Sequence, residues 1–132
     1  MTDEEKQNLI ARAVAVRRWA YAPYSHYHVG AAILAASGKV YDGGNVENAA
    51  YGSTICAERT ALVKAVSEGE RQFEAIVVAS DNGGSPCGAC RQMLAEFGLE
   101  TNVVLVDQHG TVVGESPLLA LLPDAFTREA LA

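Results

Sequence analysis

The three cysteines of this 132-residue chain form one pattern, which requires the fold to bring two distant segments together. Cys56 precedes Glu58 by two residues, and Cys87 and Cys90 form a Cys-x-x-Cys pair further along the chain. Three cysteine ligands leave one zinc position free for water, as is usual in catalytic sites, whereas structural zinc is normally closed by four protein ligands. The pattern therefore predicts a zinc site with an open position.

Both cysteine segments are expected where a loop meets the N-terminus of a helix. The partial positive charge of a helix N-terminus lowers the pKa of a thiol and favours the thiolate that binds metal. Cys87 and Cys90 are three residues apart, so their side chains share one face of the helix. The expected secondary structure and the chemistry of zinc ligation thus agree.

Two other interpretations of the cysteines stay open. A redox pair of the thioredoxin type needs only the Cys-x-x-Cys and leaves the third thiol unused. A structural zinc site needs a fourth ligand, and His26, His28 and His109 are available for it. His26 and His28 alternate in an extended segment and His109 lies in a turn, so all three are expected to be surface or loop residues.

Glu58 is the candidate proton carrier of the predicted zinc site. A carboxylate near zinc-activated water can accept its proton and pass it to a leaving group. Three thiolates around Zn²⁺ leave one net negative charge, which needs a nearby positive group. Arg59 and Arg91 are the candidates for hydrogen bonds to the cysteine sulfurs, and Arg59 is the preferred one.

The charge of the chain limits the kind of ligand. Ten basic and sixteen acidic residues give a net charge of −6, which argues against wide contact with a nucleic acid backbone. A small ligand of low charge fits this balance better. No apolar run approaches the roughly 20 residues of a membrane span, and the acidic start of the chain lacks the apolar region of a signal peptide. A cytoplasmic location is therefore expected.

The first half of the chain predicts a helix, a hairpin and a loop. Thr2 and Glu5 form a capping box that opens a helix to about residue 20. Apolar runs at 29–36 and 39–41, separated by a Ser-Gly turn, predict a β-hairpin. Two glycines at 43–44 are expected to begin a loop that reaches about Thr54.

The second half alternates helices and strands. Predicted helices cover 57–68, 87–97 and 116–122, and predicted strands cover 75–79, 103–106 and 111–113. This alternation after a hairpin favours a mixed sheet with helices on both faces. The length suits one domain over residues 1–132.

Two segments carry the signature of the zinc-dependent nucleobase deaminases: Cys56-Ala57-Glu58 and Pro86-Cys87-Gly88-Ala89-Cys90. More specifically, the chain resembles the small homotetrameric cytidine deaminases. The further segments that look like motifs of this family, in the same order, are Tyr21–Ser25, Val29–Ala32, Gly44–Tyr51 and Leu121–Phe126. The resemblance implies an α/β fold, a three-layer α-β-α sandwich with a central mixed five-stranded sheet.

The resemblance also implies a reaction. It is the zinc-dependent hydrolysis of cytidine and 2′-deoxycytidine to uridine and 2′-deoxyuridine, with release of ammonia. Cys56, Cys87 and Cys90 would hold one zinc, and Glu58 would carry the proton. One alternative is a sister deaminase that acts on another free cytosine nucleoside derivative, such as an aminoacyl-nucleoside antibiotic. A more remote one is a zinc-stabilised binding module without catalysis.

Substrate contacts are likewise implied by position in the family motifs. Asn45 and Glu47 would bind the 3′-hydroxyl of the ribose. The backbone N–H of Ala57 would bind the carbonyl oxygen of the pyrimidine. Phe126 would come from a neighbouring subunit of a homotetramer to pack on the base, and Tyr51 would lie near a subunit contact.

Tyr27 departs from the family pattern, which usually has phenylalanine at this position. Its ring can still stack on the base, but the added hydroxyl needs a hydrogen-bond partner or water. The loop before Ser85 also looks shorter than in some relatives. Both differences concern the rim of the predicted substrate pocket.

Overall fold

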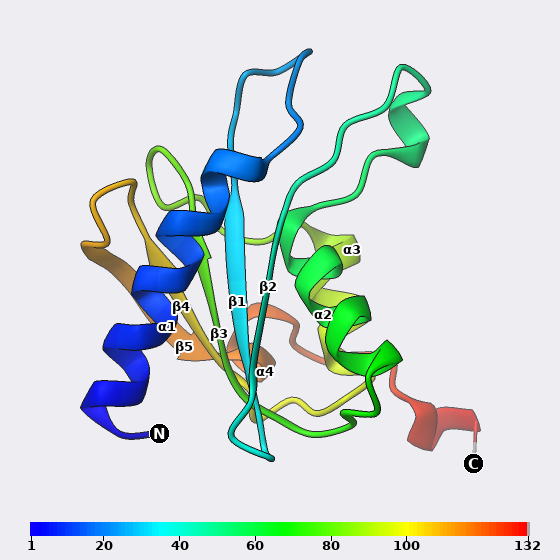
Figure 1. The fold of residues 1–132 in the computed structure, drawn as a ribbon. Helices are drawn as coiled ribbons and strands as arrows, with labels where there is room; N and C mark the ends of the chain where they lie inside the picture. The colour runs from blue at the N-terminus through cyan, green and yellow to red at the C-terminus, as the bar shows by residue number, and fades with distance from the viewer. Residues whose placement is uncertain (132) are drawn as a thin grey trace.

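One five-stranded sheet, with the strand order β2-β1-β3-β4-β5, carries helices on both of its faces (Figure 1). The computed structural model describes residues 1–131. β3 and β4 are parallel, and all other neighbouring strands are antiparallel. The elements are α1 Asp3–Val16, β1 Gly30–Ala35, β2 Val40–Gly44, α2 Ala57–Ser67, β3 Phe73–Ala79, α3 Gly88–Ala95, β4 Asn102–Val106, β5 Val112–Pro117 and α4 Leu118–Leu121, with 3-10 turns at Arg17–Trp19, Tyr51–Ser53 and Arg128–Leu131. The predicted three-layer sandwich with a mixed five-stranded sheet is confirmed.

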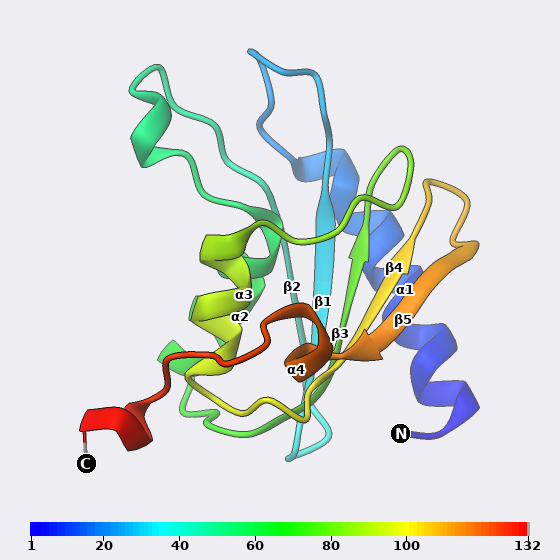
Figure 2. The ribbon, with the colours of Figure 1, turned by 180° about the vertical axis from the view of Figure 1, so that it is seen from behind.

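The central strands are buried on both faces, which explains their continuous apolar sequence. In β1, Ala31 and Ile33 belong to the core cluster beneath α2 and α3. Ala32 and Leu34 point the other way, into the cluster formed with α1. The two views show α1 on one face of the sheet and α2, α3 and α4 on the other (Figure 2).

The capping box predicted for the first helix is present. The Glu5 N–H donates to Thr2 Oγ1 at 3.0 Å, and the Thr2 N–H donates to Glu5 Oε1 at 2.8 Å. The α-helix ends at Val16, and a 3-10 turn continues it to Trp19, close to the predicted end. Among residues 1–131, no helix has the length and apolar character that a membrane span requires.

The expectation that Gly43 and Gly44 begin a loop was wrong. Both belong to β2, where Gly43 pairs with Ala31 and Gly44 pairs with Gly30. A Cβ atom on Gly43 would lie 2.5 Å from Cγ2 of Thr60 in α2. The glycine therefore lets the second helix pack closely on the strand, and its absence of a side chain does not signal a turn here.

The predicted helix at 116–122 begins later than expected. β5 extends to Pro117, and Ser116 lies opposite Val103 of β4. Only Leu118–Leu121 is helical. Pairing with β4 satisfies the backbone groups of the two residues before the helix, and this pairing outweighs their local helical pattern.

α2 and α3 begin at the same edge of the sheet, where β1 starts and β3 ends (Figure 2). At this edge Gly30 of β1 pairs with Ala79 of β3. The two helices lie on the same face and contact each other. Their N-termini are consequently held close together, although they are far apart in the sequence.

Gly30 offers a test of how closely α1 packs on the sheet. A Cβ atom there would lie 2.1 Å from the Ala13 carbonyl oxygen and 2.8 Å from Cγ1 of Val16. We expect Gly30→Ala to lower the free energy of unfolding by about 1–3 kcal/mol, because the helix must move away from the strand. Urea denaturation measures this, and Gly52→Ala, where no atom lies within 4 Å, serves as control. Equal stability of both variants would contradict the packing argument.

Candidate active site

The structure brings the three cysteine sulfurs together. All three Sγ atoms lie within 4.8 Å of one another. Cys87 Sγ is 3.7 Å from Cys56 Sγ and 3.4 Å from Cys90 Sγ. Cys56 is the N-cap residue of α2 and Cys87 that of α3, and neither side chain caps its own helix. Two helix N-termini therefore present their partial positive charge to one group of sulfurs.

The arrangement of the sulfurs fits zinc. Tetrahedral ligation with Zn–S bonds of about 2.3 Å places sulfurs about 3.8 Å apart, close to the two distances found here. All three cysteines are free thiols, and Cys87 is exposed, so the group is open on one side. Within residues 1–131 the group contains no histidine. The described part of the chain thus supplies three ligands and no fourth, unlike a closed structural site.

The sulfurs compete for negative charge. Hydrogen bonds from Cys90 and Cys87, together with the Arg59 guanidinium, lower the pKa of the Cys56 thiol to about 5. The hydrogen bond to Cys56 and burial raise the pKa of Cys90. The Cys56 thiolate is therefore stabilised by hydrogen bonds from the neighbouring sulfurs and by the Arg59 guanidinium. A divalent cation would remove this competition, because metal ligation stabilises all three thiolates.

Arg59 is placed to serve the cysteine group. Its Nη2 donates to the Thr54 carbonyl oxygen at 3.1 Å. Its Nε atom is buried and has no hydrogen-bond partner within residues 1–131. An unpaired buried donor is costly, and the adjacent Cys56 thiolate offers it an acceptor of opposite charge. Arg59 thus lies beside Cys56, as expected from the sequence.

Arg91, the second arginine considered, has different partners. It donates to the carbonyl oxygens of Pro86 and Leu121 at 2.8 and 2.6 Å, and to Ser85 Oγ at 2.8 Å. These bonds fasten the loop before Cys87 and the C-terminal segment to α3. The side chain stabilises the backbone that carries the cysteine.

Glu58 is a buried carboxyl group beside the sulfurs. It is the second residue of α2, and only 4% of it is exposed. Burial raises the pKa of the Glu58 carboxyl above its usual range, and the negative charge of Cys56 raises it further. A raised pKa makes the ionised carboxylate a better proton acceptor, which suits a group that carries a proton between water and a leaving group.

Most of the predicted site residues line one cavity of about 220 Å³. Its lining residues are Tyr27, Val29, Asn45, Thr54, Ile55, Cys56, Ala57, Glu58, Val78, Ser80, Gly84, Ser85 and Cys87. Ala57 is the first residue of α2, and the N–H of a first helical residue has no acceptor inside its helix. The cavity thus combines apolar walls with a few polar groups, as small-molecule sites do.

Asn45 is buried and fixed by the backbone around it. Its Oδ1 accepts from the Val29 N–H at 2.9 Å, and its Nδ2 donates to the Tyr27 carbonyl oxygen at 2.9 Å. An amide side chain has a second N–H and a second acceptor site. Asn45 therefore fixes the backbone just before β1 and still has an N–H group and an acceptor site for a ligand.

Glu47 does not line the cysteine cavity. It lies in a neighbouring hollow formed with Tyr24, Ser25, Tyr51 and Thr54, and Thr54 lines both spaces. The Glu47 carboxylate accepts from the N–H groups of Tyr24 and Ser25 at 3.0 and 3.1 Å and from Ser25 Oγ. The bond from the Ser25 side chain is the largest of the effects that lower the pKa of Glu47. The structure thus places a carboxylate in a hollow next to the cysteine cavity.

Phe126 lies outside the cavity of its own chain. Its side chain is 61% exposed, and its carbonyl oxygen accepts from Gln92 Nε2 of α3 at 2.8 Å. Tyr51 is 75% exposed, at the tip of the long loop before α2. Phe126 therefore does not line the site within one copy of the chain, whereas Tyr51 lines the hollow that contains Glu47.

Asn82 and Ser80 are residues near the site that sequence reasoning missed. The Tyr27 hydroxyl donates to Asn82 Oδ1 at 2.7 Å. Ser80 is buried, lines the cavity and accepts from the N–H groups of Gly83 and Gly84 at 3.0 Å each. The sequence contained one indication, because the hydroxyl of Tyr27 needs a hydrogen-bond partner. It did not indicate which residue that partner is.

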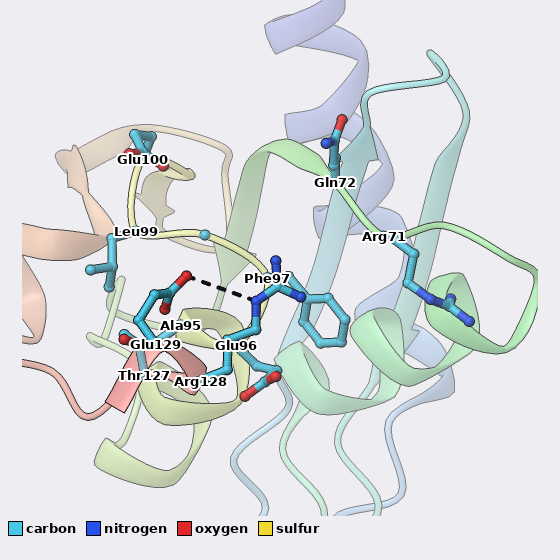
Figure 3. A pocket seen from close by; sticks show the side chains of 11 residues that line it. Arg71, Gln72, Ala95, Glu96, Phe97, Leu99, Glu100, Thr127, Arg128 and Glu129 are labelled. Atoms are coloured by element: carbon cyan, nitrogen blue, oxygen red, sulfur yellow. Dashed lines mark ion pairs between the residues drawn. The ribbon is translucent and has the colours of Figure 1, made fainter. Parts of the chain in front are cut away.

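A larger cavity of about 550 Å³ lies at the opposite end of α3 (Figure 3). It is bordered by the last turn of α3 and by the C-terminal 3-10 turn. Its ion pair joins Arg128 Nε to Glu129 Oε1 at 3.9 Å, and both side chains are 75% exposed. None of the predicted site residues lines this cavity, so it has no part in the site.

The fold and site have close counterparts among known proteins. Residues 3–106 match the family model of the cytidine and deoxycytidylate deaminase zinc-binding region. The chain is 48% identical over 128 residues to a cytidine deaminase of Sporosarcina psychrophila, covering 96% of this chain and 94% of that protein. Among crystal structures, the cytidine deaminase of Burkholderia pseudomallei superposes with a TM-score of 0.87 at 47% identity, covering 96% of this chain and 100% of the other. That of Mycobacterium tuberculosis gives 0.83 at 37% identity, covering 96% and 98%.

The fold, the cysteine group and these matches define a zinc-binding deaminase domain. The chain belongs to the cytidine and deoxycytidylate deaminase family.

The position of Arg59 predicts an effect on metal affinity. We expect Arg59→Ala to weaken zinc binding about 10–100-fold, because the negative charge of the thiolates loses its partner. Competition with a chromogenic chelator measures the affinity. Arg71→Ala removes an arginine that donates to the Val66 and Glu70 carbonyl oxygens and does not line the cysteine cavity, and it should leave zinc affinity unchanged. Equal affinities in both variants would exclude the assigned role.

Proposed function

We propose that this protein hydrolyses free cytidine and 2′-deoxycytidine to uridine and 2′-deoxyuridine with release of ammonia. The observation that carries the proposal is the position of Glu58, whose carboxyl group is buried in the same cavity as Cys56 and Cys87. The similarity to named cytidine deaminases over nearly the whole chain supports the same reaction.

The metal supplies one part of the chemistry. A zinc ion held by the three cysteines would lower the pKa of a water molecule in the cavity. Glu58 accepts a proton from the attacking water and places it on N3 of the pyrimidine while the oxygen adds to C4. Glu58 then moves the hydroxyl proton to the amino group on C4. The C4–N bond breaks, ammonia leaves, and N3 keeps its proton in the uridine product.

The remaining site residues orient the nucleoside. The Ala57 N–H is proposed to bind the carbonyl oxygen of the base, and the Tyr27 ring to form one wall against it. Asn45, with its free hydrogen-bonding capacity, and Glu47, in the neighbouring hollow, would bind the ribose hydroxyls from two sides. The separation of these two side chains into adjacent hollows supports a ligand that spans both.

Charge favours a nucleoside over a nucleotide. Within residues 1–131, no lysine or arginine lines the cysteine cavity or the neighbouring hollow. The hollow instead contains the Glu47 carboxylate, whose pKa is lowered. A phosphate group would therefore enter without a cation to neutralise it.

A neighbouring copy is proposed to complete the site. Phe126 is exposed on a C-terminal segment, and the aromatic side chains of Trp19, Tyr21 and Tyr51 are exposed as well. Such aromatic residues are enriched in protein interfaces. We propose a homotetramer in which Phe126 of one subunit packs on the base bound by another. The three free thiols suit the reducing cytoplasm, where we place the protein.

Loss of cytidine absorbance tests the proposed activity. We expect the zinc-loaded protein to deaminate cytidine and deoxycytidine, and a chelator to abolish the reaction. Glu58→Gln should keep zinc but lose about 10²–10⁴-fold in kcat, because the proton carrier is missing. The matched control is Glu68→Gln, at the exposed end of the same helix.

Two further substrates separate the alternatives. Deoxycytidine 5′-monophosphate should react with a kcat/KM about 100-fold lower than deoxycytidine, because of its phosphate charge. An aminoacylated cytosine nucleoside in the same assay tests the sister-deaminase alternative. Near-normal turnover by Glu58→Gln would refute the assigned mechanism, and zinc binding without any turnover would favour the non-catalytic module.

A site shared between subunits predicts the mass of a tetramer and weaker substrate binding when Phe126 is replaced. Light scattering should give about four times the chain mass of 13.9 kDa. Phe126→Ala should raise KM for cytidine about tenfold without loss of zinc, because a buried aromatic contact to the base disappears. Leu131→Ala, which alters an exposed apolar residue on the same segment, is the control. A monomer with full activity would contradict the shared site.

A further inference from the structure

Two loops that border the cysteine cavity are joined by a hydrogen bond between side chains. The Tyr27 hydroxyl, in the segment before β1, donates to Asn82 Oδ1, in the loop after β3, at 2.7 Å. A second link runs beside it: Arg17 donates to the His28 carbonyl oxygen at 2.9 Å and forms an ion pair with Asp81. Asp81 is about half exposed, so this ion pair contributes little stability. Of the two links, the hydrogen bond from Tyr27 is the one that involves a residue lining the cavity.

The surroundings leave the Tyr27 hydroxyl little freedom. A Cβ atom on Gly84 would lie 2.8 Å from this hydroxyl, so the phenol occupies the space that a side chain at 84 would fill. The loop opposite is itself held, because the Gly83 and Gly84 N–H groups donate to the buried Ser80 hydroxyl. The hydrogen bond thus connects the partly buried Tyr27 side chain, which packs against Gly84, to a loop held by its own hydrogen bonds.

The two partners stand in different relations to the cavity. Tyr27 and Gly84 line it, whereas Asn82 is exposed and does not. The loop continues within a few residues to Cys87, one of the three sulfur ligands. A contact that holds this loop against Tyr27 therefore also holds the part of the cavity wall that Tyr27 and Gly84 form.

We propose that Asn82 is a positioning residue for substrate binding, which acts by holding the Tyr27 ring as a wall of the cavity. The Tyr27 hydroxyl and Asn82 together form a latch between the segment before β1 and the loop before Cys87. The latch makes the wall rigid before the nucleoside arrives, so that less ordering is required on binding. This inference rests on the proposed deamination of cytidine.

Single substitutions remove either half of the latch. Tyr27→Phe deletes only the hydroxyl, and Asn82→Ala deletes its acceptor. Each should raise KM for cytidine about two- to tenfold, the effect of one net hydrogen bond, while kcat and zinc content stay within about twofold. The double variant should be no worse than Asn82→Ala alone, because the bond that Tyr27→Phe removes is already absent there; Asn82→Ala also removes the 3.5 Å hydrogen bond from Ser80 Oγ. Asn82→Asp retains an acceptor oxygen and should recover most of the loss.

Tyr41→Phe is the matched control. Tyr41 donates to Glu70 Oε2 at 2.8 Å and does not line the cavity. Its substitution should lower stability without changing KM. Unchanged KM in both latch variants, independent effects that multiply in the double variant, or an equal rise of KM in Tyr41→Phe would each overturn the proposal.

Hydrogen exchange separates failure of the latch from failure of the proposed function. Amides in residues 80–86 should exchange faster in Tyr27→Phe and Asn82→Ala than in the unmodified protein, and Tyr41→Phe should not alter them. If the unmodified protein does not deaminate cytidine, the proposed function fails, and this measurement alone decides whether the latch exists. Unchanged exchange would then overturn the latch as well.

Discussion

The close approach of three cysteine sulfurs at the N-termini of two helices is the constraint on which the rest of the site depends. Three thiolates within 4.8 Å repel one another unless positive charge surrounds them. The fold meets this requirement with the N-termini of α2 and α3 and with the Arg59 guanidinium. These groups lower the pKa of the Cys56 thiol, and a bound cation would stabilise all three thiolates. Glu58 is buried beside the same charge, which is one reason its pKa is raised.

The sheet makes this meeting of helices possible. β1 and β3 are adjacent central strands, and the helices that start next to their paired ends lie on one face. Close packing at Gly43 lets α2 approach the sheet, and the amide of Asn45 fixes the backbone at the start of β1. The polar groups of the cavity are therefore attached to regular elements or fastened to them. Such preorganisation reduces the reorganisation needed during the reaction.

The cysteine cavity and the neighbouring hollow differ in their charged groups. The cavity holds Glu58 and cysteine sulfurs among mainly apolar walls, whereas the hollow contains the Glu47 carboxylate beside the Tyr24 and Tyr51 side chains. The aromatic residue that resemblance assigned to the base, Phe126, is exposed away from the cavity of its own chain. The proposed homotetramer would bring an aromatic side chain from a neighbouring copy to this region and would cover some of the exposed aromatic side chains.

The features that the sequence determined by itself are those that depend on nearby residues. The spacing of Cys87 and Cys90, the capping box of α1 and the apolar runs of the central strands each follow from local geometry, and the predicted sheet with helices on both faces was correct. Family motifs extended this to Asn45 and Tyr27, which do line the cavity.

Only the tertiary structure decided what depends on contacts between distant segments. Gly43 and Gly44 look like a turn, but Gly43 packs beneath α2 and Gly44 packs against Ala20, and Ser116 looks helical although it pairs with β4. Asn82 carries no local signal, because its role arises from a tyrosine fifty-five residues away. Backbone pairing and close packing override local preference where a residue meets a partner from another part of the chain, and a linear pattern does not record which partner that is.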